Sequence, residues 1–218
     1  MSVVSHPNWA GKAEVRRLNS LYELLAALSR ASALEDVYAS AINSLLAATS
    51  ADRAAILIFD DDAVIRFKWW HGLSSEYRQA VTGHTPWPKG TLGARPFFIA
   101  DVLGDESLAA YHEVFVREGI RALGFVPLEL EAGVFGKIIL YYAEPHECAP
   151  DELAIAQAIA THVALATERK RAELACARSE GRLQAILDNS NAVIFLKDVH
   201  GRYLLVNRRY EDVFPAVP

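Results

Sequence analysis

The feature that most restricts the fold is a long stretch near the C-terminus that contains almost no helix breaker. From Asp151 to Leu187 the chain has no proline, and its first glycine in that range is Gly181. A continuous helix of this length would span about 55 Å, which exceeds the helices of ordinary compact domains. Its first half is apolar and its second half is rich in charged residues. The pattern predicts a helix that packs on a domain at one end and leaves it at the other, as a linker does.

Composition and charge exclude several classes of protein. The chain has 218 residues, of which 52% are hydrophobic and 22% are charged, so it can build a large core. A net charge of -5 argues against a dedicated nucleic-acid-binding domain, which usually carries a basic surface. No apolar run is long enough to span a bilayer, and the N-terminus lacks the basic and apolar regions of a secretory signal. We therefore expect a cytoplasmic globular protein without a membrane span.

The sequence also lacks the usual signatures of catalytic and metal sites. Its two cysteines, Cys148 and Cys176, form no CxxC pair. Nucleotide-binding and hydrolase motifs are absent, and a zinc-protease motif starting at His112 fails because Val116 replaces its second histidine. His146 and Cys148 are too few ligands for a zinc site. We predict no catalytic residue, no metal and no resident cofactor, which leaves open an unknown small-molecule ligand.

Apolar periodicity predicts the order of the helices and strands. Two helices fill residues 13–48, and a Pro- and Gly-rich irregular segment covers residues 82–93. A helix from Ser107 to Glu118 should end at Gly119. Two of the predicted strands are apolar on both faces, which indicates central strands covered on both sides. The predicted strands are Ala54–Phe59, Ala63–His71, Phe97–Val102, Arg121–Leu130 and Val134–Ala143.

Three of these stretches resemble motifs of the GAF domain family. They are Phe98–Val102, Gly119–Leu128 and Val134–Ile139. The resemblance covers about residues 15–170 and implies an α+β fold. Its central antiparallel sheet of about six strands would be sandwiched by helices and followed by a long C-terminal signalling helix. On this basis residues 1–12 are an N-terminal tail, residues 13–170 the GAF domain and residues 151–187 a linker helix that overlaps its end.

The C-terminal residues resemble the opening of a PAS domain. Arg178–Leu187 is similar to the PAS lead-in, and Phe195–Asp198, Gly201–Tyr203 and Val206-Asn207 are similar to its first hairpin. The resemblance implies that residues 188–218 are the truncated start of a PAS domain, a partial PAS hairpin. Because an isolated hairpin is marginally stable in water, we expect this tail to be disordered, or ordered only by a neighbouring chain or the GAF body.

An aromatic and polar set surrounds the pocket that the GAF resemblance implies. An apolar wall with a few polar groups is typical of a small-molecule site. Trp69 is expected to face a lid formed by residues 74–93 and 107–118, with Asp101 as the polar anchor at its rim. Alternatively, the aromatic residues only fill the core and Asp101 accepts backbone N–H bonds at a helix start. The candidates are Trp69, Trp87, Phe98, Asp101, Tyr111, His112, Phe115, Arg121 and Phe125.

Phytochrome-like GAF domains attach a bilin through a cysteine in the second half of the pocket. No cysteine lies between Phe97 and Leu130 in this chain. We therefore do not expect a covalent bilin.

The resemblances together imply the sensory input region of a signalling protein, such as a histidine kinase or a cyclic-dinucleotide enzyme. Downstream signalling domains would be its partners, and the rival hypothesis is a ligand-free dimerisation module. A 3-4 spacing on the long helix is typical of a coiled-coil seam. We therefore predict a parallel homodimer through this helix and the N-terminal helix from Ala13 to Ser29. The seam residues are Leu153, Ala156, Ala160, Val163, Thr167, Leu174 and Ala177.

Overall fold

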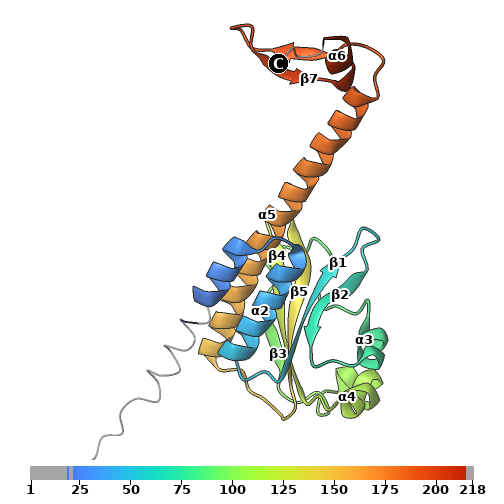
Figure 1. Ribbon diagram of the computed structural model, residues 1–218. Coiled ribbons are helices and arrows are strands. Elements are labelled where there is room, and N and C mark those ends of the chain that lie inside the picture. Colours follow the sequence, from blue (N-terminus) through green and yellow to red (C-terminus); the bar gives the residue numbers. More distant parts are fainter. Residues whose placement is uncertain (1–18, 20–21, 215–218) are drawn as a thin grey trace, which may run out of the picture. The chain divides into compact units, whose positions relative to one another are not determined.

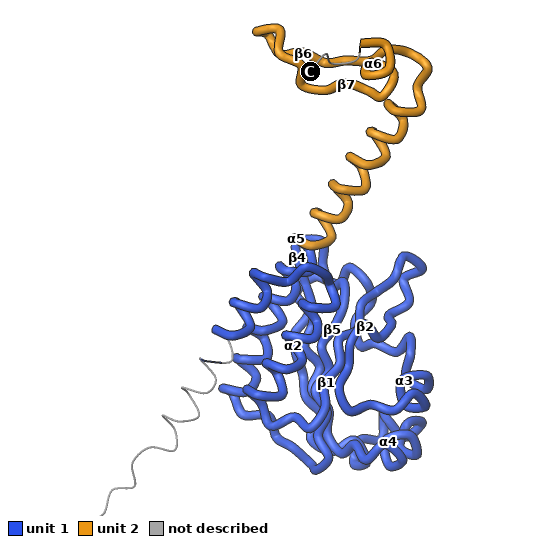
Figure 2. Tube along the Cα trace, viewed as in Figure 1, with its two compact units in different colours: residues 1–168 blue, residues 169–218 orange. Residues whose placement is uncertain are grey.

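The computed structural model describes residue 19 and residues 22–214, and the chain divides into two compact units (Figure 2). The first unit ends at Glu168 and the second begins at Arg169. The predicted tail, residues 1–12, and the first part of the predicted N-terminal helix lie outside the described residues. Residues 22–30 of that helix are helical.

A five-stranded antiparallel sheet forms the centre of the first unit (Figure 1). Its order is β2-β1-β5-β4-β3, so β5 and β1 are flanked on both sides. These five strands correspond to the five predicted from the apolar runs, whereas the family resemblance implied about six. They confirm the predicted α+β, GAF-like fold. Their bounds are Arg53–Phe59 (β1), Ile65–His71 (β2), Phe97–Ile99 (β3), Ala122–Leu130 (β4) and Gly133–Tyr142 (β5).

Helices cover both faces of this sheet (Figure 1). Residues 22–30, α2 (Leu34–Ala48) and the first half of α5 (Pro150–Asp188) cover one face, which we call the α2–α5 face. The other, the α3–α4 face, is covered by α3, by a 3-10 helix η1 and by α4. Their bounds are Ser75–Val81 (α3), Glu106–Tyr111 (η1) and His112–Glu118 (α4). The predicted helix 107–118 is thus divided in two, and it ends as expected at Gly119, whose φ is 70°.

Side chains of the central strands alternate between two separate cores because successive residues of a strand point to opposite faces. On β5, Ile138 and Leu140 belong to the core of the α2–α5 face. Ile139 and Tyr141 belong to the core of the α3–α4 face. The sheet therefore separates two sets of contacts that share the same backbone.

Most of the predicted coiled-coil seam is buried inside the first unit. Ala156, Ala160, Val163 and Thr167 are at most 3% exposed, and the first three belong to the core of the α2–α5 face. They cannot form a seam with a second chain, so this part of the prediction was wrong. The reason is that a helix packed on a sheet carries an apolar stripe with nearly the same spacing as a coiled coil.

Trp69 lies on the opposite face from the one predicted. Phe67 pairs with Leu57, but Trp69 pairs with Ile56, so Lys68 is an extra residue at a β-bulge. A bulge of this kind interrupts the alternation of side chains along a strand. Trp69 consequently packs against the core of the α2–α5 face, whereas Ile65 and Phe67 belong to the α3–α4 face.

The irregular segment 82–93 is tied to the start of β5. Gly90 donates its N–H to the carbonyl of Val134 at 2.8 Å, and the Val134 N–H is bound by the Thr91 carbonyl at 2.9 Å. Gly133 has a φ of 93°, and a Cβ at this position would collide with the backbone of Gly90. Glycine at this position allows the two backbones to approach, and so fixes one end of the segment over the α3–α4 face.

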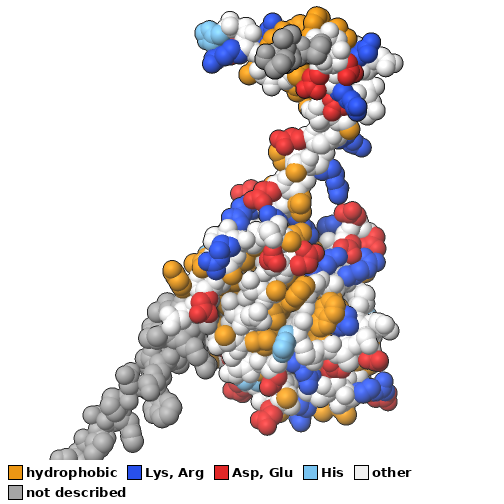
Figure 3. All heavy atoms as spheres, in the orientation of Figure 1, with side chains coloured by type: hydrophobic (Ala, Val, Ile, Leu, Met, Phe, Trp, Pro, Cys, Tyr) orange, Lys and Arg blue, Asp and Glu red, His pale blue; other side chains and the backbone are white. Residues whose placement is uncertain are grey.

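The second unit contains the end of α5 and a small hairpin. Its elements are β6 (Phe195–Lys197), β7 (Tyr203–Val206) and α6 (Arg208–Val213). Asn207 is fully buried, and its side-chain amide donates to the carbonyls of Leu187 and Ala192, both at 2.9 Å. The hairpin is thus ordered by contacts within its own unit, which the sequence did not predict. Hydrophobic side chains remain exposed on this unit (Figure 3). Among them, Phe195 is 51% and Leu204 is 63% exposed.

Candidate ligand site

A cavity of about 540 Å³ lies on the α3–α4 face of the sheet. Its wall is formed by β1, β3, β4, β5, α3, η1, α4 and the residues between His84 and Pro86. Small-molecule sites generally measure roughly 300–1,000 Å³ and have mainly apolar walls with a few polar groups. This cavity meets both conditions. Its apolar lining residues are Leu57, Tyr77, Val81, Pro86, Phe97, Phe98, Ile99, Leu108, Tyr111, Phe115, Leu123, Phe125 and Ile139.

Four of the nine sequence candidates line this cavity: Phe98, Tyr111, Phe115 and Phe125. Phe115 is buried on α4, and its ring centroid lies 6.3 Å from that of Tyr111. Phe98 also packs over Gly124 on the α2–α5 face, where a Cβ on the glycine would collide with its ring. Phe98 therefore packs against the core of the α2–α5 face, although it also lines the cavity.

The other candidates lie outside the lining of the cavity. Trp69 lies on the α2–α5 face. Trp87 packs against the core of the α3–α4 face beside Phe97, and the two ring centroids are 5.7 Å apart. His112 Nε2 lies 3.2 Å from the carbonyl oxygen of Asp105. Arg121 is also outside, and its place is set by its partner, Asp101.

Asp101 and Arg121 form an ion pair away from the cavity. Arg121 Nη2 donates to Asp101 Oδ2 at 2.8 Å, and the Leu103 N–H donates to Asp101 Oδ1 at 3.1 Å. The hydrogen bond from Arg121 lowers the pKa of the Asp101 carboxyl group. The contact with the Leu103 N–H fits the alternative hypothesis, in which Asp101 accepts backbone N–H bonds instead of anchoring a ligand.

The charged residue that sequence reasoning missed is Lys137, on β5. It lines the cavity and is only 2% exposed. Its Nζ donates to the carbonyl oxygen of His84 at 2.7 Å and lies 5.3 Å from the centroid of the Phe125 ring. Burial lowers the pKa of this ammonium group to about 7. The sequence does indicate this position. Residues 137, 139 and 141 alternate along an apolar strand, so Lys137 must point to the same face as Ile139 and Tyr141.

His84 also links two segments that cover the cavity. Its ring Nδ1 lies 3.0 Å from the hydroxyl oxygen of Tyr111, and the ring centroids are 5.1 Å apart. His84 belongs to the segment 82–93, whereas Tyr111 is the last residue of η1. One chain of polar contacts thus runs from Lys137 on β5 through His84 to Tyr111 on η1. It connects the sheet to the segment 82–93 and to η1, which both cover the cavity.

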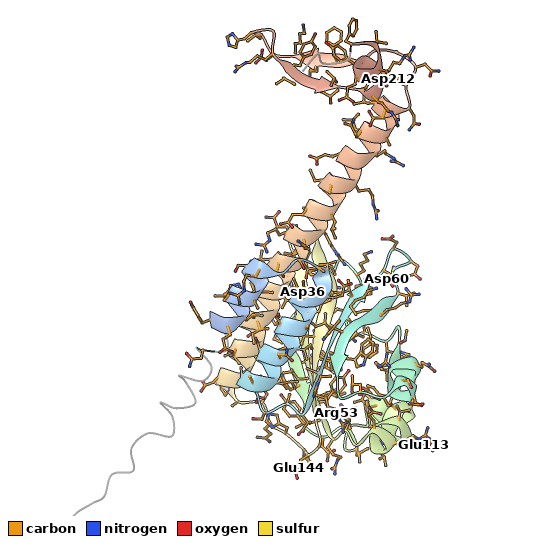
Figure 4. All side chains as sticks on the ribbon, in the orientation of Figure 1. Asp36, Arg53, Asp60, Glu113, Glu144 and Asp212 are labelled. Atoms are coloured by element: carbon orange, nitrogen blue, oxygen red, sulfur yellow. The ribbon has the colours of Figure 1, made fainter. Side chains whose placement is uncertain are left out.

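Contacts of Arg53, which Figure 4 labels, and of Glu118 fix α3 and α4 to the end of the sheet. Arg53 Nη1 donates to the carbonyl oxygen of Glu118 at 2.7 Å. The Glu118 carboxylate accepts hydrogen bonds from the N–H of Ser74 at 2.7 Å and from its hydroxyl at 2.5 Å. Ser74 in turn caps α3 by accepting from the Tyr77 N–H. The two short helices of the cover are therefore held together at one end.

A second buried polar cluster lies at the start of α5. Glu152 Oε2 is 2.7 Å from His146 Nε2, and its Oε1 accepts from the Tyr142 hydroxyl at 3.0 Å and from the Ser50 N–H at 3.1 Å. Burial alone would raise the pKa of Glu152, but these hydrogen bonds lower it. Both carboxylate oxygens are occupied, so this cluster ties α5 to the sheet and leaves no group free for a ligand.

The described part of the chain offers neither a membrane-spanning helix nor a metal-binding cluster. Among these residues no helix is both long enough and apolar enough to cross a membrane. Within the same part of the chain, no three His, Cys, Asp or Glu side chains gather in a way that would hold a metal ion.

Comparison with known proteins identifies the class of this fold and then its family. Solved GAF domains share the fold: one from a phosphoenolpyruvate-protein phosphotransferase of Coxiella burnetii is 20% identical, with a TM-score of 0.61 over 74% of this chain and 98% of that one. The GAF domain family model matches residues 33–167. The chain therefore belongs to the GAF domain family. GAF domains are regulatory and not catalytic on their own, so this chain is a sensory signalling domain.

Two further structures show the range of the relatives. A domain described as part of a two-component sensor histidine kinase from Sinorhizobium meliloti 1021 is 38% identical, with a TM-score of 0.63 over 67% of this chain and 99% of that one. The chromophore-binding domain of the bacteriophytochrome RpBphP3 from R. palustris is 14% identical, with a TM-score of 0.58 over 78% of this chain and 64% of that one. The second likeness concerns the fold alone. No curated protein matches the chain.

Proposed function

We propose that the GAF domain senses a small molecule, which binds in the cavity on the α3–α4 face. The observation that carries this proposal is the cavity itself, about 540 Å³ with an aromatic wall and a few inward polar groups. The cavity also lies between the sheet and short covering segments, which the His84–Tyr111 and Ser74–Glu118 contacts link to one another. Such segments can adopt different arrangements when a ligand is bound and when it is absent.

The signal would pass from the cavity to α5 through the sheet. Ile139 lines the cavity, while its neighbours Ile138 and Leu140 pack in the core that contains Ile159 and Val163 of α5. A ligand shifts an equilibrium between two arrangements only by its difference in affinity for them. In this mechanism the ligand favours one packing of α3, η1 and α4 on the sheet, and β5 transmits the change to α5.

We further propose that this domain is the input region of a sensor histidine kinase or a cyclic-dinucleotide enzyme. The 38% identity to a domain described as part of a sensor histidine kinase supports the first of these outputs. In this proposal residues 13–170 are the GAF domain, residues 151–187 a linker helix and residues 188–218 the start of a PAS domain. The hairpin of β6 and β7, with its exposed apolar side chains, supports the PAS assignment.

A homodimer is also part of the proposal, through surfaces other than the buried seam. Leu165 on α5 is 53% exposed, and Tyr22 and Leu25 are exposed on the helical residues 22–30. Exposed large apolar residues on two helices support an interface between helices of two chains. Light scattering at tens of micromolar should give the mass of a dimer, and a monomer would contradict this part of the proposal.

The ligand-sensing proposal is tested with the purified protein and two tryptophan variants. Native mass spectrometry and an ultraviolet-visible spectrum report a co-purifying molecule, and a thermal-shift screen of uncharged aromatic fragments reports binding. Val81→Trp places a large ring in the cavity lining, whereas Val116→Trp adds the same ring at an exposed position of α4 outside it. We expect Val81→Trp to abolish binding and Val116→Trp to retain it. Equal binding by both variants would mean that the molecule binds outside the cavity and would contradict the proposal. No bound molecule in either assay would favour the ligand-free dimerisation module.

A further inference from the structure

Lys137 is a buried cation without a charged partner. It is 2% exposed, and among the residues that the structure describes no carboxylate lies within 4.0 Å of its Nζ. A buried charge is costly unless it is paired and hydrogen-bonded, so buried lysines are uncommon outside functional sites. The depressed pKa of the ammonium group is a second sign of the same cost. Below a pH of about 7 the protein therefore carries an unpaired positive charge at the wall of its cavity, because the pKa of Lys137 is lowered to about 7.

The ammonium group also has unused hydrogen-bonding capacity. A lysine ammonium carries three N–H donors. Only one of them has a protein acceptor in the described structure, the carbonyl oxygen of His84 at 2.7 Å. The Phe125 ring, 5.3 Å away, adds a weak attraction through its face. Two donors thus remain for a group that enters the cavity.

The acidic residue of the cavity wall is already engaged elsewhere. Asp105 Oδ1 accepts from the Ser107 N–H at 2.9 Å and from the Ser107 hydroxyl at 2.6 Å, and Asp105 caps η1. These hydrogen bonds lower the pKa of Asp105. Asp105 therefore stabilises the cover of the cavity and does not neutralise Lys137.

The rest of the wall is suited to a flat aromatic ring. Phe97 and Phe125 are stacked, with centroids 5.0 Å apart and an interplanar angle of 25°. Tyr77 and Phe115 form another part of the wall, with centroids 6.4 Å apart. Aromatic rings gain from stacked or edge-to-face contacts with such side chains. The wall thus combines one cation with several aromatic faces.

We propose that the cavity binds an aromatic monocarboxylate, whose carboxylate pairs with Lys137 Nζ and whose ring packs against Phe125 and Phe115. This inference rests on the proposed ligand-sensing function and adds the chemical class of the ligand. Lys137 is the one lysine or arginine that lines the cavity among the described residues, which matches one carboxylate rather than a phosphate dianion.

The experiment compares acids with their own uncharged amides. Isothermal titration at pH 6.5 uses benzoate, cinnamate, 2-naphthoate and indole-3-acetate, each beside its primary amide. Each pair is measured with the wild type, with Lys137→Met, and with Lys89→Met. Lys89 is the matched control, because its Nζ also donates to a backbone carbonyl, that of Asp60 at 3.2 Å, but at an exposed position. Circular dichroism checks the fold of each variant, and Lys137→Gln provides a second uncharged side chain.

We expect at least one acid to bind the wild type about ten- to a hundred-fold more tightly than its amide, as a charge-assisted hydrogen bond provides. Lys137→Met and Lys137→Gln should remove that preference, whereas Lys89→Met should retain it. Equal binding of acid and amide, or an acid affinity unchanged in Lys137→Met, would overturn the proposed class while the ligand-sensing function stands. Failure of every acid at millimolar concentration would also overturn the class, and failure of the uncharged fragments as well would remove the ligand-sensing function.

Discussion

The two faces of the central sheet share the same strands but differ in how completely they are filled. On the α2–α5 face, Ile56, Ile138 and Leu140 are fully buried against helices. On the α3–α4 face, their neighbours Leu57 and Ile139 border a cavity of about 540 Å³. Protein interiors are normally packed as densely as organic crystals. One face is thus filled by helix side chains, whereas the other keeps a space that the proposed ligand would occupy.

The polar groups of the two faces differ in the same way. Glu152, at the α5 side, has hydrogen-bond partners on both carboxylate oxygens. Lys137, at the cavity, has one backbone carbonyl and no carboxylate partner among the described residues. Incompletely satisfied buried groups concentrate at functional sites, where their cost is tolerated for the sake of binding.

The largest expected effect comes from truncating two adjacent isoleucines that point to opposite faces. Ile138→Ala should lower the free energy of unfolding by about 4 kcal/mol, because it leaves a void in a filled core. Ile139→Ala should cost about 2 kcal/mol, because its side chain already borders empty space and has fewer contacts to lose. Urea unfolding followed by circular dichroism measures both values. Equal costs for the two substitutions would mean that the faces are equally well packed.

Removal of the Glu152 side chain tests the satisfied polar cluster. Glu152→Ala leaves the Tyr142 hydroxyl, the Ser50 N–H and His146 without their common acceptor. We expect a loss of about 3 kcal/mol of stability, because the buried Tyr142 hydroxyl loses its acceptor and the contacts to Ser50 and His146 are lost with it. The same urea titration measures it, and the exposed Glu113→Ala on α4 is the control (Figure 4). A change no larger than that of Glu113→Ala would show that the cluster does not hold α5 on the sheet.

Substitution of Lys137 should act in the opposite direction. Lys137→Met replaces a buried charge by an apolar side chain of similar length, so we expect it to stabilise the protein by about 2 kcal/mol at pH 6.5. Lys89→Met should leave the stability nearly unchanged. A destabilised Lys137→Met protein, with Lys89→Met unchanged, would mean that the ammonium group has a stabilising partner and would weaken the contrast between the faces.

The pH dependence of stability gives an independent measure of the same charge. Burial lowers the pKa of Lys137 to about 7, against an ordinary value of 10.5. Between these values the unfolded chain binds more protons than the folded one, so stability should rise with pH by up to about 1.4 kcal/mol per pH unit. Lys137→Met should lack this slope between pH 7 and pH 9.5.

The other titratable groups lining the cavity are Tyr77, His84, Asp105 and Tyr111. They are present in both proteins, so the difference between wild type and Lys137→Met isolates the lysine. Of these groups, Tyr77 has a raised pKa because of its burial, and Asp105 has a lowered one because of its hydrogen bonds to Ser107. Parallel pH profiles of the two proteins would contradict the assignment.

The smallest effect is expected at Asp101, which lies outside the cavity lining. Its carboxylate pairs with Arg121 at a half-exposed position and binds the Leu103 N–H. Asp101→Ala should leave the dissociation constant of the best-binding aromatic acid unchanged within about two-fold, because the substitution removes no contact with the cavity. Isothermal titration beside Lys137→Met measures it. A ten-fold loss of affinity would restore the sequence-based prediction that Asp101 anchors the ligand.

The sequence predicted the sheet well because each strand carries a strong apolar run bounded by turn residues. Ala54–Phe59 and Ile138–Tyr142 are apolar on both faces, and both lie in the centre of the sheet. Side-chain direction was less predictable. A single bulged residue, Lys68, turned Trp69 to the other face, and strand alternation alone gives no sign of a bulge.

The candidate site was predicted only in part for a related reason. Phe98, Tyr111, Phe115 and Phe125 were identified because aromatic residues are conspicuous in a sequence, and all four line the cavity. Lys137 was overlooked although it stands in phase with inward-facing residues of β5. His84 lies in an irregular segment without periodicity, so its contact with Tyr111 could be found only in three dimensions.

Methyl NMR can show whether a ligand binds on the α3–α4 face and not on the α2–α5 face, as we propose. Selectively ¹³C-labelled isoleucine methyl groups report on Ile99 and Ile139, which line the cavity, and on Ile56 and Ile138, which lie on the α2–α5 face. 2-Naphthoate and its uncharged amide are titrated separately, so the result does not depend on Lys137. We predict that at least one of them shifts Ile99 and Ile139 several-fold more than Ile56 and Ile138. Larger shifts of Ile56 and Ile138, or no shift at millimolar concentration of either compound, would contradict the account.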